Sequence, residues 1–338
     1  MNLVTGATGL VGSHLLLDLL LRGEQVAGLC RENSDKTIVE KIFEHYGHKD
    51  LYGQVIWRTG DINDLESLRA VMTDVDTVYH TAAMVSFEKK SHERMWATNV
   101  NGTINIIETI VEGGCKTKLC VTSSIGALGH TPDGSLIDEQ TPYQSDSNRT
   151  AYSLSKFRQE MEVWRGIEKG LKAVIVNPGV ILGPCVGTRS CGQIAQTMQH
   201  GTKYYTEGAT GYVDVRDVAK AMIELTEKNM FGERYILVGE NSSVKHIEDL
   251  MADAFCQKRP TRFASKVELH IAAAALRVKS WLTGCAPALT RESVRAMGGC
   301  RQYSSQKIID TIGINFISLE DSVKNMTDFH KNYNDKAQ

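Results

Sequence analysis

From Asn2 to Val176 the chain alternates short apolar runs with longer segments in which apolar positions recur at helical spacing. The apolar runs have the length of buried strands. They are Asn2–Thr5, Gln25–Cys30, Val55–Arg58, Thr77–His80, Lys118–Thr122 and Ala173–Val176. The helical segments are Leu10–Arg22, Thr37–Tyr46, a segment opened by a capping box at 63–66, Ser91–Glu112 and Arg149–Glu168. Because parallel strands need a crossover connection, this order predicts an α/β fold with a doubly wound parallel sheet and helices on both faces.

A glycine-rich turn lies where the first predicted strand passes into the first helix. Its residues are Thr5, Gly6, Ala7, Thr8, Gly9, Leu10, Val11 and Gly12. Gly6 permits a tight turn, Gly9 lets the backbone approach a pyrophosphate, and Gly12 lets the helix pack closely on the strand. The helix N-terminus adds free N–H groups and a partial positive charge. The turn predicts a dinucleotide site, although a glycine triplet also occurs in ordinary turns.

After Asn177 the pattern becomes irregular, with glycine and proline crowded between positions 178 and 192. One further strand, Tyr235–Val238, is expected to return to the main sheet. Helices are expected at Val244–Phe255, Glu268–Leu282 and Leu319–His330. We therefore expect a dinucleotide-binding domain over residues 1–183, with a strand near 235–239 added to its sheet. A smaller, mainly helical substrate lobe would cover residues 184–338 and would be discontinuous.

Composition narrows the classes of function. The chain has 338 residues, 42% of them hydrophobic, and a formal net charge of −2. This balance, without a basic stripe, disfavours nucleic acid and anionic membranes as partners. No apolar run reaches the ~20 residues of a membrane span, and the N-terminal segment is a strand rather than a leader. The eight cysteines lack metal-ligand spacing. We expect no metal site, and a cytoplasmic protein whose cysteines are small core residues.

A second candidate site combines a strand end with a helix. Tyr152 and Lys156 are four positions apart on a predicted helix, so they share one face, and Ser123 and Ser124 follow the strand Lys118–Thr122. A phenol can deliver a proton to a carbonyl oxygen, a nearby ammonium lowers the phenol pKa, and a hydroxyl can hold that oxygen. A Tyr/Lys pair alone usually marks a solvated helix face. Behind a nucleotide-binding turn and a strand-ending serine pair, we interpret it as a carbonyl-reducing site.

Eight motifs follow one another in an order that resembles a known family. They are residues 5–12, 60–62, 80–83, 99–103, 122–124, 152–156, 177–184 and 214–219. Together they resemble the extended short-chain dehydrogenases/reductases of the NAD-dependent epimerase/dehydratase group, most closely the dihydroflavonol-reductase-like branch. The resemblance runs from Met1 to about residue 240 and continues more weakly beyond it. It implies a Rossmann-type fold with a smaller C-terminal substrate-binding lobe, and an NAD(P)-dependent enzyme.

The resemblance also implies catalytic roles. Tyr152 would be the proton donor, Lys156 would also bind the ribose hydroxyls, and Ser124 would hold the carbonyl oxygen. Ser124 is preferred to Ser123 because the motif aligns the second serine with that role. Asn99 would support this network, although an asparagine inside a helix can equally be solvated. Asp214, Arg216 and Asp217 are interpreted as a structural cluster of ion pairs and helix caps that joins the two lobes.

Cofactor contacts are implied at three further strand ends. Asp61 would accept a hydrogen bond from the adenine amino group and Ile62 would cover the ring, although Asp61 can equally close a turn. Thr81, Ala82 and Ala83 would leave room for the nucleotide at the end of the fourth strand. Pro178, Gly179 and Val180 would lie along the nicotinamide.

Two departures from the family narrow the choice. The segments 127–129 and 181–183 read Ala-Leu-Gly and Ile-Leu-Gly where nucleotide-sugar epimerases usually have Val-Tyr-Gly, which favours a simple reductase. Arg31 follows the second strand, where an NAD-preferring enzyme places an aspartate for the ribose diol. Its guanidinium suits a phosphate, Lys36 could add a second charge, and Glu32 opposes both. We therefore expect NADP(H) in preference to NAD(H).

These observations predict an oxidoreductase that reduces a ketone or oxidises a secondary alcohol of a small organic substrate. A nucleotide-sugar epimerase or dehydratase is an alternative on the same scaffold. A non-enzymatic NAD(P)-binding sensor is another, but that fate usually goes with a lost Tyr or Lys, and this chain keeps both. The family commonly forms homodimers through its long helices, and Ile104, Ile106, Ile107, Ile110 and Val111 offer apolar surface for one.

Overall fold

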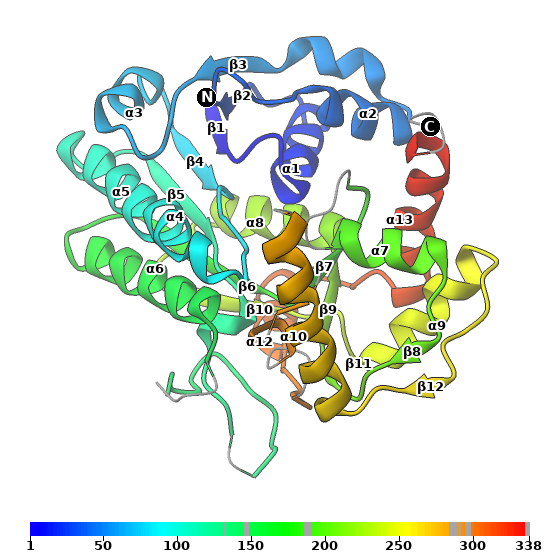
Figure 1. Ribbon diagram of the computed structural model, residues 1–338. Coiled ribbons are helices and arrows are strands. Elements are labelled where there is room, and N and C mark those ends of the chain that lie inside the picture. The colour runs from blue at the N-terminus through cyan, green and yellow to red at the C-terminus, as the bar shows by residue number, and fades with distance from the viewer. Residues whose placement is uncertain are drawn as a thin grey trace.

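A computed structural model describes residues 1–131, 133–144, 149–185, 191–283, 289–290, 292–294 and 299–334. Its main sheet has seven parallel strands in the order β10-β6-β5-β4-β1-β2-β3 (Figure 1). The strands are β1 Asn2–Thr5, β2 Val26–Cys30, β3 Ile56–Thr59, β4 Thr77–His80, β5 Lys118–Thr122, β6 Ala173–Pro178 and β10 Glu233–Leu237. From β1 the chain adds β2 and β3 on one side of the sheet. From β4 it adds β5, β6 and β10 on the other side. The order therefore reverses between β1 and β4, where a doubly wound sheet binds its ligand.

Helices cover both faces of this sheet. Near it lie α1 Leu10–Leu21, α2 Thr37–His45, α3 Leu65–Val71, α4 His92–Trp96, α5 Gly102–Glu112, α6 Ala151–Glu168 and α8 Val215–Glu227. Strand residues alternate between the faces, so Leu3 packs with α3, α5 and α6 while its neighbour Val4 packs with α1 and α8. This alternation gives the sheet two separate apolar layers.

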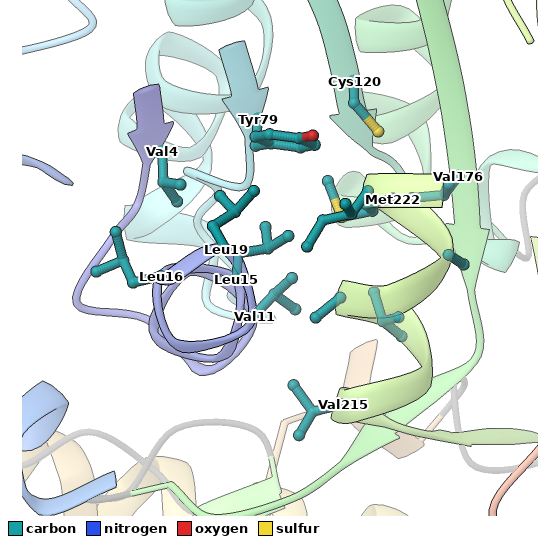
Figure 2. Close-up of a cluster of buried hydrophobic side chains, with 14 of the residues drawn as sticks. Val4, Val11, Leu15, Leu16, Leu19, Tyr79, Cys120, Val176, Val215 and Met222 are labelled. Atoms are coloured by element: carbon teal, nitrogen blue, oxygen red, sulfur yellow. The ribbon is translucent and has the colours of Figure 1, made fainter. Parts of the chain in front are cut away.

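The layer between α1 and α8 joins distant parts of the sequence. Leu15 and Leu19 of α1 meet Met222 of α8 beneath Tyr79 of β4 and Val176 of β6 (Figure 2). The side chains of this set are at most 2% exposed. Truncating one such leucine to alanine typically costs about 2–5 kcal/mol. The helix α1, which follows the N-terminal glycine-rich turn, therefore packs against α8, a helix about two hundred residues further along the chain.

A smaller lobe is built from the remaining elements. Its sheet has the order β11-β9-β7, from β7 Val180–Leu182, β9 Ala209–Asp214 and β11 Glu240–Ser243, and β8 Tyr204–Tyr205 pairs with β12 Arg262–Phe263. The helices are α7 Cys191–His200, α9 Val244–Ala254, α10 Lys266–Thr283, α12 Gln306–Ile312 and α13 Leu319–Asn334. β7 directly follows β6 and β11 directly follows β10, so the lobe lies beside the carboxyl edge of the main sheet.

Most predicted elements are confirmed to within one or two residues. The expected capping box is shifted, because Asp64 rather than Asn63 caps α3 by accepting from the N–H groups of Glu66 and Ser67. The expected helix Ser91–Glu112 is a short 3-10 turn, α4, a π-helical turn at Ala97–Asn101, and α5. The strand expected near 235–239 does join the main sheet. The domain boundary at 183/184 stays a prediction.

Two expectations from composition can be compared with the structure. Cys30, Cys120 and Cys185 are buried, but Cys256 and Cys300 are exposed, so the cysteines are not all core residues. Among the described residues no helix is long and apolar enough to cross a membrane, and no group of His, Cys, Asp or Glu is arranged to hold a metal ion. The cytoplasmic location stays a prediction.

Candidate active site

The glycine-rich turn has the close packing that its spacing predicts. Gly6 has φ of +66°, and a Cβ there would lie 2.7 Å from the backbone of Ala82. A Cβ on Gly12 would lie 2.2 Å from the carbonyl oxygen of Gly6. Both positions therefore exclude any side chain. The turn is closed by a hydrogen bond of 2.8 Å from the N–H of Gly9 to the carbonyl of Gly6.

The outer side of this turn fits a dinucleotide pyrophosphate. A Cβ on Gly9 would meet only the Gly6 carbonyl, at 3.1 Å, among the described residues, so the space beyond it is open. Gly9 is also the N-cap of α1, and neither a capping side chain nor an acidic residue lies in the first turn of that helix. The N–H groups of Leu10 and Val11 and the helix dipole thus remain to bind an anion.

The ends of β1 and β4 are tied together beside the turn. The Thr81 hydroxyl donates to the Thr5 carbonyl at 2.7 Å, and the Ala82 N–H donates to the Thr5 hydroxyl at 3.3 Å. Thr8 is half-buried and Ala83 is exposed. The structure thus brings these predicted cofactor residues together at the switch point of the sheet.

The residues expected near the adenosine lie at the ends of β2 and β3. Arg31 is exposed, and its N–H donates to the Ser34 hydroxyl at 3.0 Å. The Asp61 carboxylate accepts from the backbone and side-chain N–H groups of Asn63, at 2.9 and 3.1 Å, so it does close a turn. Ile62 is buried where it faces Gly102. No described residue donates to the second carboxylate oxygen of Asp61, and the adenine contact stays a prediction.

Lys36 has a different neighbour from the one expected. Its ammonium lies 5.1 Å from the ring centroid of Trp57, a cation–π distance. The second charge expected beside Arg31 is therefore directed at least partly toward an aromatic ring.

The Tyr152 phenol lies beside the Ser124 side chain. Tyr152 lies in the first turn of α6, which Thr150 caps by accepting from the Ser153 N–H at 3.0 Å. Ser124 follows β5, and its hydroxyl also accepts from the Gly126 N–H at 3.0 Å. Burial raises the pKa of Tyr152 to about 12, and the hydrogen bond with the Ser124 side chain acts in the opposite direction. Tyr152 therefore keeps its proton near neutral pH.

The neighbouring serine points elsewhere. The Ser123 hydroxyl donates to the buried carboxylate of Glu160, which also accepts from the Asn177 amide at 2.6 Å. Successive residues at a strand end face opposite sides, so only one serine of the pair can meet Tyr152. The structure places Ser124 there.

Lys156 is 1% exposed, with its ammonium inside the protein. It donates to the Thr122 carbonyl and to the Gln159 side-chain carbonyl, both at 2.9 Å. Burial lowers the pKa of Lys156 to about 7, and the negative charge of Glu160 opposes that change. An ammonium has three N–H groups, and no described residue accepts from the third.

Asn99 is buried rather than solvated, and its side chain connects two segments by hydrogen bonds. Its side chain accepts from the Met84 N–H at 2.7 Å and donates to the Met84 carbonyl and to the Ser155 hydroxyl, both at 3.0 Å. It lies in the π-helical turn at Ala97–Asn101, a feature that often marks functional sites. Asn99 therefore fixes the loop after β4 against the helix that carries Tyr152 and Lys156.

The segment after β6 approaches the same place. The Asn177 amide donates to the Ser124 carbonyl at 2.9 Å. A Cβ on Gly179 would lie 2.3 Å from the Gly211 carbonyl, so only glycine fits between Pro178 and the half-buried Val180. The three predicted nicotinamide residues thus leave the sheet one strand away from Ser124.

Comparison with known proteins agrees with this arrangement. The model of the NAD dependent epimerase/dehydratase family matches residues 2–239. The chain belongs to the NAD dependent epimerase/dehydratase family. It is accordingly an NAD(P)-dependent enzyme.

Curated relatives of this family share about 30% identity with the chain. The putative dihydroflavonol 4-reductase of Synechocystis is 32% identical over 252 residues, which cover 72% of this chain and 69% of the relative. Cinnamoyl-CoA reductase 1 of Arabidopsis thaliana is 31% identical, with coverage of 75% and 74%. The sterol demethylase protein B of Methylococcus capsulatus is 30% identical, with coverage of 77% and 76%.

Solved structures extend the likeness to the whole chain. The crystal structure of gox2253 has a TM-score of 0.81 at 30% identity, with 98% of each chain covered. The UDP-glucose 4-epimerase of Thermus thermophilus has a TM-score of 0.72 at 22% identity, with coverage of 98% and 99%. The second likeness shows the epimerase/dehydratase fold alone.

Several polar residues of this epimerase/dehydratase site were not predicted. They are His80, Thr103, Gln159, Glu160 and Glu292. Gln159 and Glu160 follow Lys156 by three and four positions, which is the spacing of one helix face, so this signal was present in the sequence. Glu292 of the second lobe accepts from the Ala151 N–H at 2.7 Å. No local pattern indicates that contact, because it depends on how the lobes pack.

Proposed function

We propose that the protein reduces a ketone of a small organic substrate, or oxidises the corresponding secondary alcohol. The observation that carries the proposal is the position of Tyr152 beside the Ser124 side chain, one helical turn from the buried Lys156. The names of two relatives, dihydroflavonol 4-reductase and cinnamoyl-CoA reductase, support a carbonyl substrate.

In this proposal the residues of the site have distinct tasks. When bound, the dinucleotide supplies or accepts the hydride. The Ser124 hydroxyl holds the substrate oxygen, and the Tyr152 hydroxyl donates its proton to that oxygen. Lys156 supplies a buried positive charge and uses its third N–H for the ribose hydroxyls. Asn99 keeps the helix that bears both groups in place.

The preferred cofactor in this proposal is NADP(H). Arg31 is exposed at the end of β2, the strand beside β1 and its glycine turn. A guanidinium in that position suits a 2′-phosphate better than a ribose diol.

Tyr152→Phe tests the catalytic assignment. NADPH consumption is followed with a panel of ketones and aldehydes for the wild type and this variant. Turnover should fall by at least about a hundredfold, the low end for general acid catalysis, while NADPH affinity changes little. Near-normal turnover in Tyr152→Phe would remove Tyr152 from the mechanism. Binding of nucleotide sugars, without reduction of any carbonyl, would favour an epimerase or dehydratase instead.

We also propose a homodimer, through α4 and α6 rather than mainly through α5. Three of the five α5 residues expected at the interface, Ile106, Ile107 and Ile110, are buried within the chain. Trp96 and Met161, in contrast, are 39% and 45% exposed. Covering these side chains would remove apolar surface from water. Light scattering should give twice the chain mass of 37.4 kDa, and Met161→Glu should shift the protein toward the monomer.

A further inference from the structure

A chain of buried hydrogen bonds connects Lys156 to the base of the glycine-rich turn. Gln159 accepts from the Lys156 ammonium at 2.9 Å and donates to the Thr103 hydroxyl at 2.9 Å. The other face of that hydroxyl meets His80 Nε2 at 2.8 Å, and His80 Nδ1 meets the Thr5 hydroxyl at 2.8 Å. All five side chains are at most 1% exposed.

The donors and acceptors of this chain can be assigned from Thr103. Its one hydroxyl proton goes to the Asn99 carbonyl, at 2.8 Å. The hydroxyl must then accept from both Gln159 and His80, so His80 carries its proton on Nε2. His80 Nδ1 is left as an acceptor for the Thr5 hydroxyl. This neutral form agrees with burial, which lowers the pKa of His80 to about 3 together with the positive charge of Lys156.

The same assignment fixes the orientation of Gln159. A flipped amide would place its carbonyl oxygen against Thr103, which has no proton left to give, and its NH₂ against the Lys156 ammonium. Gln159 therefore presents an acceptor to Lys156 as long as Thr103 keeps its hydroxyl.

We propose that Thr103, Gln159 and His80 are positioning residues. They fix the position of the Lys156 ammonium relative to the glycine-rich turn. The proposal rests on the proposed function, in which Lys156 binds the ribose of the nucleotide that the turn binds by its pyrophosphate. At one end of the chain of bonds, Thr5 immediately precedes Gly6 and is tied to Ala82. At the other end, Gln159 and the Thr122 carbonyl leave one N–H of Lys156 to the nucleotide.

Thr103→Val tests the proposal, and Thr109→Val is a matched control. Both threonines lie on α5, and each donates to the carbonyl four residues earlier at 2.8 Å. Thr109, however, has no bond to Gln159 or His80. Thr103→Ser keeps the hydroxyl. Gln159→Met removes the acceptor at Lys156 while every residue of α5 stays unchanged. NADPH affinity is measured by fluorescence titration, thermal stability by calorimetry, and kcat and KM with any carbonyl that the wild type reduces.

We expect Thr103→Val and Gln159→Met to weaken NADPH binding by about tenfold, the effect of one hydrogen bond to a charged group. The double variant should be no worse than the weaker-binding single variant, because both act through one chain of bonds. Thr103→Ser should restore binding, and Thr109→Val should leave it unchanged. In the reaction, kcat should fall while the KM for the carbonyl changes little.

Two results would overturn the proposal. One is NADPH affinity in Thr103→Val equal to that of Thr109→Val. The other is a loss of NADPH binding free energy in the double variant that equals the sum of the losses in Thr103→Val and Gln159→Met. The binding readout does not depend on turnover, so a failure to reduce any carbonyl would count against the proposed function and not against these positioning residues.

Discussion

The three glycines of the nucleotide turn should respond differently to the same added methyl group. In Gly12→Ala the new Cβ would lie 2.2 Å from the Gly6 carbonyl oxygen and 2.9 Å from the Ala7 Cα. Real contacts of this kind are not found below about 3 Å, so α1 would have to move away from β1 by roughly 1 Å in a close-packed interior. In Gly9→Ala the nearest atom is the Gly6 carbonyl oxygen, at 3.1 Å, and the backbone φ of −91° suits alanine.

These distances separate the effect on stability from the effect on binding. Gly12→Ala gains up to about 1 kcal/mol of helix propensity but loses about 1–3 kcal/mol by overpacking, and it distorts the turn. Its free energy of unfolding should fall, and NADPH affinity should fall with it. Gly9→Ala should lose at most about 1 kcal/mol, because alanine is a poorer N-cap than glycine. Its Cβ projects into the space assigned to the pyrophosphate, so NADPH affinity should fall by at least about tenfold.

Gly53→Ala is the control, because a Cβ at Gly53 meets no atom of the described residues within 4 Å and the residue has no positive φ. Its stability should change by less than about 0.5 kcal/mol and its affinity should not change. Urea unfolding and fluorescence titration of the three variants give both quantities. Wild-type affinity in Gly9→Ala, or wild-type stability in Gly12→Ala, would refute the assignment of this turn.

Three more outcomes follow from the site. Ser124→Ala should lower kcat more than Ser123→Ala, because Ser124 lies beside Tyr152 whereas Ser123 donates to Glu160; the reverse order in a steady-state comparison would exchange the two serines. Arg31→Ala should abolish a preference of NADPH over NADH that we expect to be about 1–3 kcal/mol, or roughly five- to hundredfold in Kd; an unchanged ratio would place the specificity elsewhere. Lys156 has a folded-state pKa of about 7, below its usual 10.5, so the folded protein binds fewer protons than the unfolded chain between these values. The stability of the wild type relative to Lys156→Met should therefore rise with pH across that window, while the cost of burying the charge is fully present below about pH 7; a flat difference in urea unfolding contradicts this.

The sequence predicted the strands of the main sheet well because their apolar runs are short and are bounded by polar or glycine residues. It did not predict α8, which follows the irregular segment after Asn177, although Val215–Glu227 has a clear apolar face on α1. Tyr152, Lys156 and the pair Ser123 and Ser124 were found from spacing and a strand end, and the family motif selected Ser124. The direction of a side chain was not predictable in the same way. Lys156 was expected beside the phenol, but its ammonium donates to Thr122 and Gln159, because its direction depends on how α6 approaches β5.

The place of α8 and β10 in the main sheet has a consequence for how the chain folds during synthesis. Val4, Tyr79 and Val176 reach their final burial only when Met222 and Val218 have been added, and β6 gains its outer neighbour only with Glu233–Leu237. A nascent chain that has been translated only as far as α6 still exposes one apolar face of its sheet. Such long-range contacts slow folding and leave an aggregation-prone surface in the interval. The glycine-rich turn is translated before α8 and β10, yet these two elements complete the sheet that supports it.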